Sequence, residues 1–251
     1  VNWVQQATNS SQPTNNIQML NSTTGFAVSG NSTPTAQGIL VKTTNAGTNW
    51  VPIVLPSPYS EQNAVDLEFI NENTGWIIGG KPFITGGGIT CIKTTNGGTN
   101  WVFQPNDIGY AFVSVDIDMA DANTGYFIAG TTAAVFKTTN GGNNWNKLLS
   151  SPAGSYNKIQ ALSASTVILS GSAGLLTKTT NGGTSWNPIA TTNPNITFFA
   201  MQWTDEMNGT IGGTGGYLAK TTNGGINWKT FNSGGSTIRN ISMRNRDSVF
   251  A

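Results

Sequence analysis

Hydrophobic and polar residues alternate over short runs throughout the chain. Three clear runs are Val65-Leu67-Phe69, Val113-Val115-Ile117 and Ile238-Ile241-Met243. Alternation over a few residues that are mostly β-branched or aromatic is typical of β-strands. No stretch of ten or more residues places its apolar positions at helical spacing. The pattern therefore predicts an all-β chain.

A nine-residue segment that starts with Lys-Thr-Thr and ends with Trp occurs five times. The copies cover residues 42–50, 93–101, 137–145, 178–186 and 220–228. They follow one another every 41 to 51 residues, and a period of this size is typical of four-stranded propeller blades. An Asn-Thr-Gly-aromatic motif precedes some copies, as in Asn73–Trp76 and Asn123–Tyr126.

Each repeat is interpreted as four antiparallel strands. The alternating run forms the first, and the second begins at the aromatic residue after Thr-Gly. The third ends at Lys-Thr-Thr, and the fourth starts near the Trp. Asn-Gly-Gly supplies the hairpin turn between the last two, because Asn and Gly tolerate a positive φ. We expect the repeated lysine to protect outer strands from edge pairing, rather than to form a basic ring for a partner.

Two residues of every repeat are assigned structural roles. Each turn asparagine is expected to cap its own hairpin through the side-chain oxygen. These residues are Asn45, Asn96, Asn140, Asn181 and Asn223. Each tryptophan is expected to pack one blade against its neighbour. These residues are Trp50, Trp101, Trp145, Trp186 and Trp228.

The repeated pattern Thr-x-Asn-x-Gly-x-x-Trp resembles the Asp-box, or bacterial neuraminidase repeat, whose form is Ser/Thr-x-Asp-x-Gly-x-x-Trp. Thr43, Asn45, Gly47 and Trp50 occupy these positions in the first copy. The sequence of the repeat is most similar to that of propellers related to the photosystem II assembly and stability factor. Many secreted bacterial proteins carry it as well. The resemblance implies a β-propeller over essentially the whole chain, with Asn in place of Asp in all five copies.

We expect one β-propeller domain over residues 1–251, with six blades. The sixth blade would consist of strands at 238–243 and 248–251, completed by Asn2-Trp3-Val4 from the start of the chain. An N-terminal strand that completes the last blade removes free sheet edges. The chain starts at Val1 and ends within an apolar strand. We therefore expect it to be a segment of a longer protein, in which the blades would number seven or more.

Composition excludes several functional classes. The sequence has no His, one Cys and a net charge of +1, and 9% of its residues are charged. Imidazole catalysis, imidazole metal sites, disulfides and thiolate clusters are thereby excluded. A nucleic-acid groove would need a basic surface, and no stretch is apolar and long enough to span a bilayer. We expect no cofactor, no nucleic-acid partner and no direct membrane insertion.

The Asp-box resemblance suggests sialidase activity, but the chain lacks the arginines that would bind the substrate. In sialidases three arginines from different blades bind the substrate carboxylate. This chain has only Arg239, Arg244 and Arg246, all in the last repeat. Guanidinium groups from separate blades are needed for the bidentate contacts. The sequence therefore argues against a sialidase.

Four acidic residues on two predicted first strands leave a choice between chemistry and structure. They are Asp66, Glu68, Asp116 and Asp118. Two carboxylates could serve a glycoside hydrolase, and oxygen-rich clusters can hold a cation. Alternatively, these acids bond backbone amides or pair with Lys158 and Arg239. We favour the structural alternative, and expect no catalytic residue and no metal site.

The loops between blades and those between second and third strands are expected on one face, where the sequence varies most. Variable loops on a rigid scaffold are the usual place for recognition, and tyrosines are common interface anchors. The candidate binding residues are Tyr59, Glu61, Phe83, Asp107, Tyr110 and Tyr156. The alternative is that each tyrosine packs over its own blade.

Together with these observations, the resemblance implies a non-catalytic scaffold, secreted or on a bacterial cell surface, that binds a protein partner or joins a larger surface assembly. A carbohydrate-binding propeller is the alternative, and a glycoside hydrolase ranks below it.

Overall fold

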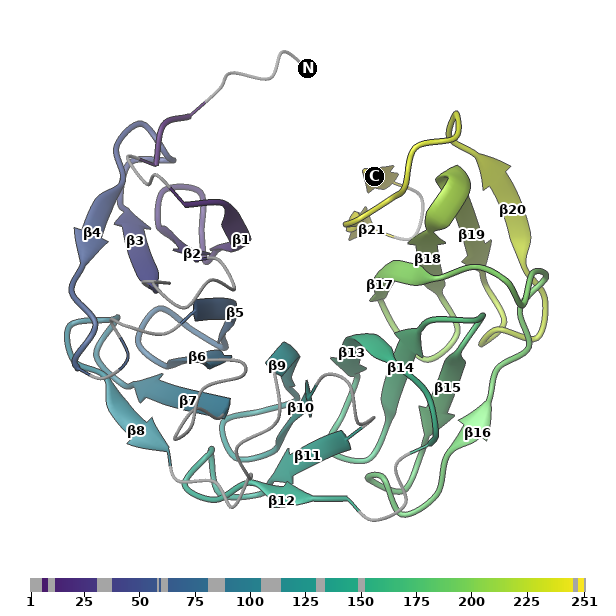
Figure 1. Cartoon of the computed structure of the whole chain (residues 1–251), viewed down its shortest axis with the longest axis horizontal. Coiled ribbons are helices and arrows are strands. Elements are labelled where there is room, and N and C mark those ends of the chain that lie inside the picture. The colour runs from purple at the N-terminus through teal and green to yellow at the C-terminus, as the bar shows by residue number, and fades with distance from the viewer. Residues whose placement is uncertain are drawn as a thin grey trace. The chain divides into compact units, whose positions relative to one another are not determined.

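A computed structural model describes residues 6–8, 12–30, 38–57, 59, 63–80, 89–104, 114–129, 134–148, 152–245 and 248–250. Within these residues the strands form five four-stranded sheets and one two-stranded sheet (Figure 1). Each strand pairs with the next along the chain, the pairing order of a propeller blade. The chain is an all-β β-propeller with four-stranded blades, the fold class that the repeat predicts.

The strands are short and follow the predicted pattern in every repeat. Blade one contains β1 (Thr14–Met19), β2 (Gly25–Ser29), β3 (Ile39–Thr43) and β4 (Val51–Ile53). Blade two contains β5 (Asn63–Phe69), β6 (Gly75–Gly80), β7 (Ile89–Thr94) and β8 (Val102–Gln104). Blade three contains β9 (Ser114–Met119), β10 (Gly125–Ala129), β11 (Ala134–Thr138) and β12 (Asn146–Lys147).

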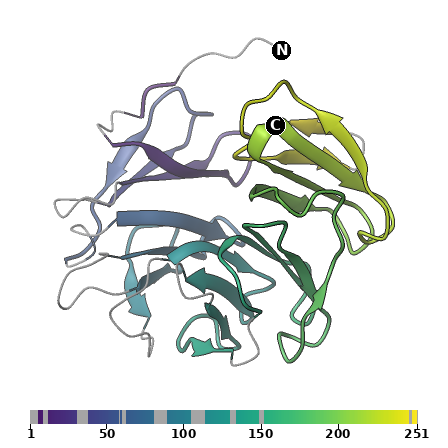
Figure 2. The same ribbon diagram turned by 45° about the vertical axis from the view of Figure 1, so that its right-hand side comes forward.

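The second half of the chain continues in the same way. Blade four contains β13 (Tyr156–Ala161), β14 (Val167–Gly171), β15 (Leu176–Thr179) and β16 (Asn187–Pro188). Blade five contains β17 (Phe198–Trp203), β18 (Gly209–Gly213), β19 (Tyr217–Thr221) and β20 (Lys229–Asn232), with the 3-10 helix η2 (Thr214–Gly216) before β19 (Figure 2, green to yellow). The last sheet contains β21 (Ser242–Asn245) and β22 (Ser248–Phe250).

The expectation of six four-stranded blades is wrong, because the described residues form five. After β20 they supply only β21 and β22, which pair with each other in a two-stranded sheet. The sequence has no sixth Lys-Thr-Thr copy from which a third strand could form. Asn2-Trp3-Val4, expected to complete this sheet, lies outside the described residues.

The chain divides into two compact units. The first comprises Val1–Ile117 with Thr139–Trp145, and the second Asp118–Thr138 with Asn146–Ala251. In the first unit, the Phe26 and Phe69 rings stack with centroids 4.2 Å apart, and Trp101 meets Phe69 edge-on at 6.1 Å. In the second, Trp228 meets Trp203 edge-on at 5.9 Å. Each of these tryptophans follows its hairpin and packs on the last residue of a first strand, where large apolar surfaces are buried between sheets.

A threonine and an asparagine organise the turn of each repeat. In blade two, Asn96 Oδ1 accepts hydrogen bonds from Thr94 Oγ1 at 3.0 Å and from the Asn100 amide at 2.9 Å. Thr94 Oγ1 in turn accepts one from the Gly98 amide at 3.0 Å. Gly97 and Gly98 have φ values of 65° and 83°, which favour glycine. The same bonds recur in blades one, four and five.

The repeated lysine joins neighbouring blades. Lys42 Nζ donates to the carbonyl of Gly97 at 3.0 Å and lies 5.0 Å from the Phe26 ring centroid. Lys93 donates to Gly141 at 3.0 Å over the Trp76 ring, and Lys137 donates to Gly182 at 3.1 Å over the Tyr126 ring. The expected role in edge protection is wrong, because these lysines lie on third strands, which are paired on both sides.

No helix in the described part of the chain is long and apolar enough to cross a membrane.

The turn network predicts a difference between two substitutions of Asn96. Asn96→Ala removes the acceptor for two hydrogen bonds and should lower the free energy of unfolding by about 1 kcal/mol, as for other side-chain caps. Asn96→Asp keeps an acceptor oxygen in the same place and should retain most of that stability. Urea denaturation followed by tryptophan fluorescence measures both. Equal losses for the two variants would show that the acceptor does not stabilise the turn.

Candidate functional site

Tyr59 lies in the loop that joins β4 of blade one to β5 of blade two. A turn fixes this loop, because the Tyr59 amide donates to the Pro56 carbonyl at 2.8 Å. The half-buried ring packs against the core shared by blades one and two, which includes Leu55, Ala64 and Ile77. The phenol is therefore held by the scaffold, which suits an interface anchor.

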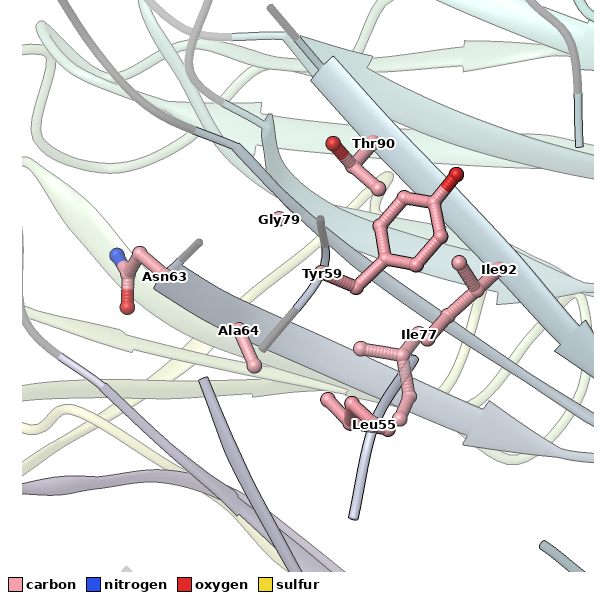
Figure 3. Close-up of a pocket in the computed structure, with 8 residues that line it drawn as sticks. All are labelled: Leu55, Tyr59, Asn63, Ala64, Ile77, Gly79, Thr90 and Ile92. Atoms are coloured by element: carbon pink, nitrogen blue, oxygen red, sulfur yellow. The ribbon is translucent and has the colours of Figure 1, made fainter. Parts of the chain in front are cut away.

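The Tyr59 ring lines a small pocket (Figure 3). Leu55, Ile77 and Ile92 form its apolar lining, and Asn63 and Thr90 add polar groups. In Figure 3 the Tyr59 hydroxyl points away from Asn63. The cavity measures about 10 Å³, which is room for about one water molecule. Such a recess accepts the tip of a side chain but no sugar ring, because small-molecule pockets are many times larger.

Phe103 on β8 extends the apolar surface beside the pocket. Its ring stacks on Tyr59 with centroids 5.8 Å apart and planes 15° apart, and 45% of the residue is exposed. Val102, its neighbour in β8, is 64% exposed and points to the opposite face of the strand. We name Tyr59, Phe103, Leu55, Asn63 and Thr90 the Tyr59 surface.

The Tyr59 surface has no charged side chain among these five residues. Burial, together with the nearby Cys91, raises the pKa of Tyr59 above its ordinary value, so the phenol stays neutral at physiological pH. A neutral aromatic surface of this kind favours contact with apolar and uncharged polar groups of a partner.

The sequence prediction included Tyr59 but missed Phe103. Phe103 follows directly after the repeated Trp101-Val102, and an exposed aromatic residue at this strand position was the signal that could have found it. Glu61, Phe83, Asp107 and Tyr110, also predicted to bind the partner, lie outside the described residues.

Tyr156 is a packing residue of blade four. It is 3% exposed, and its hydroxyl donates to the Pro152 carbonyl. Burial raises the pKa of Tyr156 to about 12. Such a side chain offers no surface to a partner, so it fits the alternative in which a tyrosine packs over its own blade.

Two of the acidic residues on first strands accept hydrogen bonds from a neighbouring strand. Asp66 accepts from the Ile117 amide at 2.9 Å through one oxygen and from Asn16 through the other. Asp118 accepts from the Ala161 amide at 2.6 Å. Glu68 and Asp116 also have interaction partners. Among the described residues, no group of three or more His, Cys, Asp or Glu side chains could hold a metal ion.

Glutamines also form hydrogen bonds to the neighbouring first strand, and the sequence analysis missed them. Gln160 accepts from the Trp203 amide at 2.7 Å and donates to its carbonyl at 2.8 Å. Gln18 bonds both backbone groups of Phe69 at 2.7 and 3.0 Å. Like Asp118, both precede the last residue of a first strand. This shared position is the signal that identifies them as structural links, and it supports the structural reading of the acids.

Comparison with known proteins gives a family match. The family model described as photosynthesis system II assembly factor YCF48 matches residues 48–193, which is more than half of the chain. A search of curated proteins finds no match.

Solved structures show the same fold at low sequence identity. One described as YCF48 bound to D1 peptide is 16% identical with a TM-score of 0.54, and the match covers 98% of this chain and 90% of that one. YCF48 from Cyanidioschyzon merolae is 15% identical with a TM-score of 0.61, covering 84% and 70%. The GH74 enzyme of Niastella koreensis is 14% identical with a TM-score of 0.65, but this chain spans only 38% of it. Identities this low establish the fold alone.

The burial of Tyr156 predicts a loss of stability in alkali. The unfolded tyrosine ionises near 10.0 and the folded one only near 12. The stability that its neutral form contributes is therefore complete below about pH 10 and is lost as the pH rises towards about 12. Tyr156→Phe should lower the free energy of unfolding by about 1 kcal/mol near neutral pH, through the lost hydrogen bond, and should reduce the alkaline loss. Denaturant titrations at neutral and alkaline pH measure both. If parent and variant lost equal free energy in alkali, Tyr156 would not be the responsible group.

Proposed function

Because the chain belongs to the photosynthesis system II assembly factor YCF48 family, we propose that it is a non-catalytic β-propeller that binds a protein partner and acts as an assembly scaffold. The observation that carries this proposal is the stacked pair of Tyr59 and Phe103 beside a recess too small for a small-molecule ligand. Support also comes from a protein of the same fold that is described as bound to D1 peptide.

The Tyr59 surface has the chemistry of a protein interface. Aromatic side chains dominate the binding energy of such interfaces, above all where they flank a recess that a partner side chain fills. Asn63 and Thr90 supply polar groups beside the apolar residues Leu55 and Ile92. The partner segment that fits is therefore an uncharged peptide with a small apolar side chain for the recess.

Carbohydrate binding is the second candidate. Exposed aromatic rings such as Phe103 also stack on sugars, and one protein of the same fold is described as a GH74 xyloglucanase from Xanthomonas campestris. The size of the recess and the hydrogen bonds of Asp66 and Asp118 favour the peptide over the sugar and binding over hydrolysis.

We also propose that the protein is exported to the cell surface or beyond, as the secreted proteins with this repeat suggest. Fractionation of the source cells, followed by detection of the chain, tests the localisation separately from the binding site.

Binding to the Tyr59 surface predicts a specific loss of affinity. Peptides selected from a random displayed library on the immobilised chain serve as probes, and fluorescence polarisation measures their affinity. Tyr59→Ala and Phe103→Ala should each weaken binding about tenfold or more, equivalent to about 1.4 kcal/mol. Val102→Ala, which removes an exposed side chain from the other face of the same strand, should leave affinity unchanged.

Two results would contradict this proposal. Equal affinity of the parent, Tyr59→Ala and Phe103→Ala for every selected peptide would place the binding site elsewhere. Binding of xyloglucan oligosaccharides that is lost in Phe103→Ala would favour the carbohydrate-binding candidate, and release of reducing ends from xyloglucan would show an enzyme.

A further inference from the structure

The fourth strand of each blade is an edge strand. Among the described residues, β4, β8, β12 and β16 each pair only with the third strand of their own blade. An edge strand offers unpaired backbone N–H and C=O groups, with which a strand of another chain can pair. Proteins block such pairing with proline, which has no N–H group, or with a charged side chain such as that of lysine.

The register of the strands identifies the residue whose backbone groups point outward. Hydrogen-bonded and non-hydrogen-bonded pairs alternate along an antiparallel ladder. In blade three the Leu148 amide donates to the Val135 carbonyl at 2.8 Å, so this is a hydrogen-bonded pair. The preceding pair, Lys147 with Phe136, is therefore not hydrogen-bonded, and Lys147 points its backbone N–H and C=O to the outer edge.

The same register position exists in every blade. It is the residue that pairs with the one before the repeated lysine, as Lys147 pairs with Phe136 before Lys137. In three blades it is a residue that blocks pairing, and all three are exposed: Pro52 on β4, Lys147 on β12 and Pro188 on β16. In blade five it is Thr230, directly after Lys229. Edge protection thus lies on the fourth strands.

Blade two differs at this position. The residue that pairs with Ile92, before Lys93, is Phe103, which has a backbone N–H group and no charge. Val102 and Gln104, the other residues of β8, are also uncharged. Of the five fourth strands, β8 alone therefore contains neither proline nor lysine. Its outer edge is open to a further strand.

The Phe103 side chain adds specificity to this edge. A strand that pairs with β8 places one side chain directly beside Phe103, on the face where Phe103 stacks on Tyr59. Gln104 Nε2 donates to the Phe103 carbonyl at 3.1 Å. A carbonyl oxygen has two lone pairs, so it still accepts a bond from an added strand.

We propose that β8 binds an extended segment of a partner protein as a fifth strand of blade two. This inference rests on the proposed function and adds how the segment is held. Its backbone pairs with the N–H and C=O groups of Phe103, and one apolar side chain packs on Phe103 and Tyr59, as in other cases of strand addition. Charge complementarity selects an uncharged segment, because a charge beside these neutral rings would lose water without gaining a partner.

Proline at position 103 tests the backbone contribution. The probes are the peptides selected from the displayed library, and fluorescence polarisation measures their affinity. Phe103→Ala removes the ring and keeps the N–H group, whereas Phe103→Pro removes both. Phe103→Pro should bind about fivefold more weakly than Phe103→Ala, because a backbone hydrogen bond is lost as well.

Two controls accompany this comparison. The fold itself accepts proline here, since blades one and four have it at the same position, and urea denaturation checks that the variant is folded. Lys147→Pro makes the same backbone change on β12 and should leave peptide affinity unchanged.

Methylation of the peptide backbone tests the same contact without altering the protein. Alternate residues of a strand point their amides to the same side. N-methylation of each peptide residue in turn should therefore weaken binding at every second position within the bound segment, by about fivefold or more. The residues between them should tolerate the methyl group.

The outcomes separate this inference from the proposed function. Peptides that Tyr59→Ala weakens, but that bind Phe103→Ala and Phe103→Pro equally and show no alternation, would overturn the fifth strand and leave the Tyr59 surface in place. A library without binders, or binders unaffected by Tyr59→Ala and Phe103→Ala, would overturn both. Dimers of the free chain that Phe103→Lys abolishes in sedimentation velocity would give β8 to a second copy and overturn the partner segment.

Discussion

The packing of each Asn-Gly-Gly hairpin against the side chains of the preceding blade is the interaction on which the rest of the structure depends. Two-stranded hairpins are marginal in water, and they become stable when a sheet packs against them. In blade two the hairpin meets blade one through Gly98, which has no side chain to hold the two apart. The hairpin backbone therefore comes close enough for Lys42 of blade one to bond the Gly97 carbonyl. Burial lowers the pKa of Lys93 and Lys137 below the ordinary lysine value. Their bonds to carbonyls and their contacts with aromatic rings offset the cost of that burial.

Most of the fold could be predicted because its determinants are local. The Thr, Asn and Gly of a turn form hydrogen bonds within five residues of one another. Their spacing in the sequence is therefore enough to predict the shape of the turn. The role of Lys42 could not be predicted, because its acceptor at Gly97 belongs to the next repeat. Six blades were expected from the alternation at 238–243. Alternation predicts that a strand forms, but it does not predict how many strands pair in its sheet.

The candidate site was harder to predict for the same reason. Tyr59 and Tyr156 both lie near the start of a first strand, and nothing in their immediate sequence separates them. Tyr156 is the first residue of β13 and is buried. Tyr59 lies in the loop before β5 and packs on the core shared by blades one and two. The partner ring of Tyr59 comes from Phe103, 44 residues away in the sequence. Proximity of this kind follows from the sheet packing and leaves no local signal.

The asparagine of each Asn-Gly turn, in blades two to five, also affects how the protein ages. An Asn-Gly step is prone to deamidation, in which the glycine nitrogen attacks the side-chain carbonyl and the amide becomes a carboxyl or an isomerised backbone link. In the hairpins of blades two and four that nitrogen is held in a hydrogen bond, from Gly97 to the Asn73 carbonyl at 2.9 Å and from Gly182 to the Ser165 carbonyl at 2.8 Å. The side-chain oxygen is held as well, by the amide four residues later. The bonds that shape each turn thus keep the reacting atoms engaged, and a blade that opens exposes its turns to irreversible chemical damage.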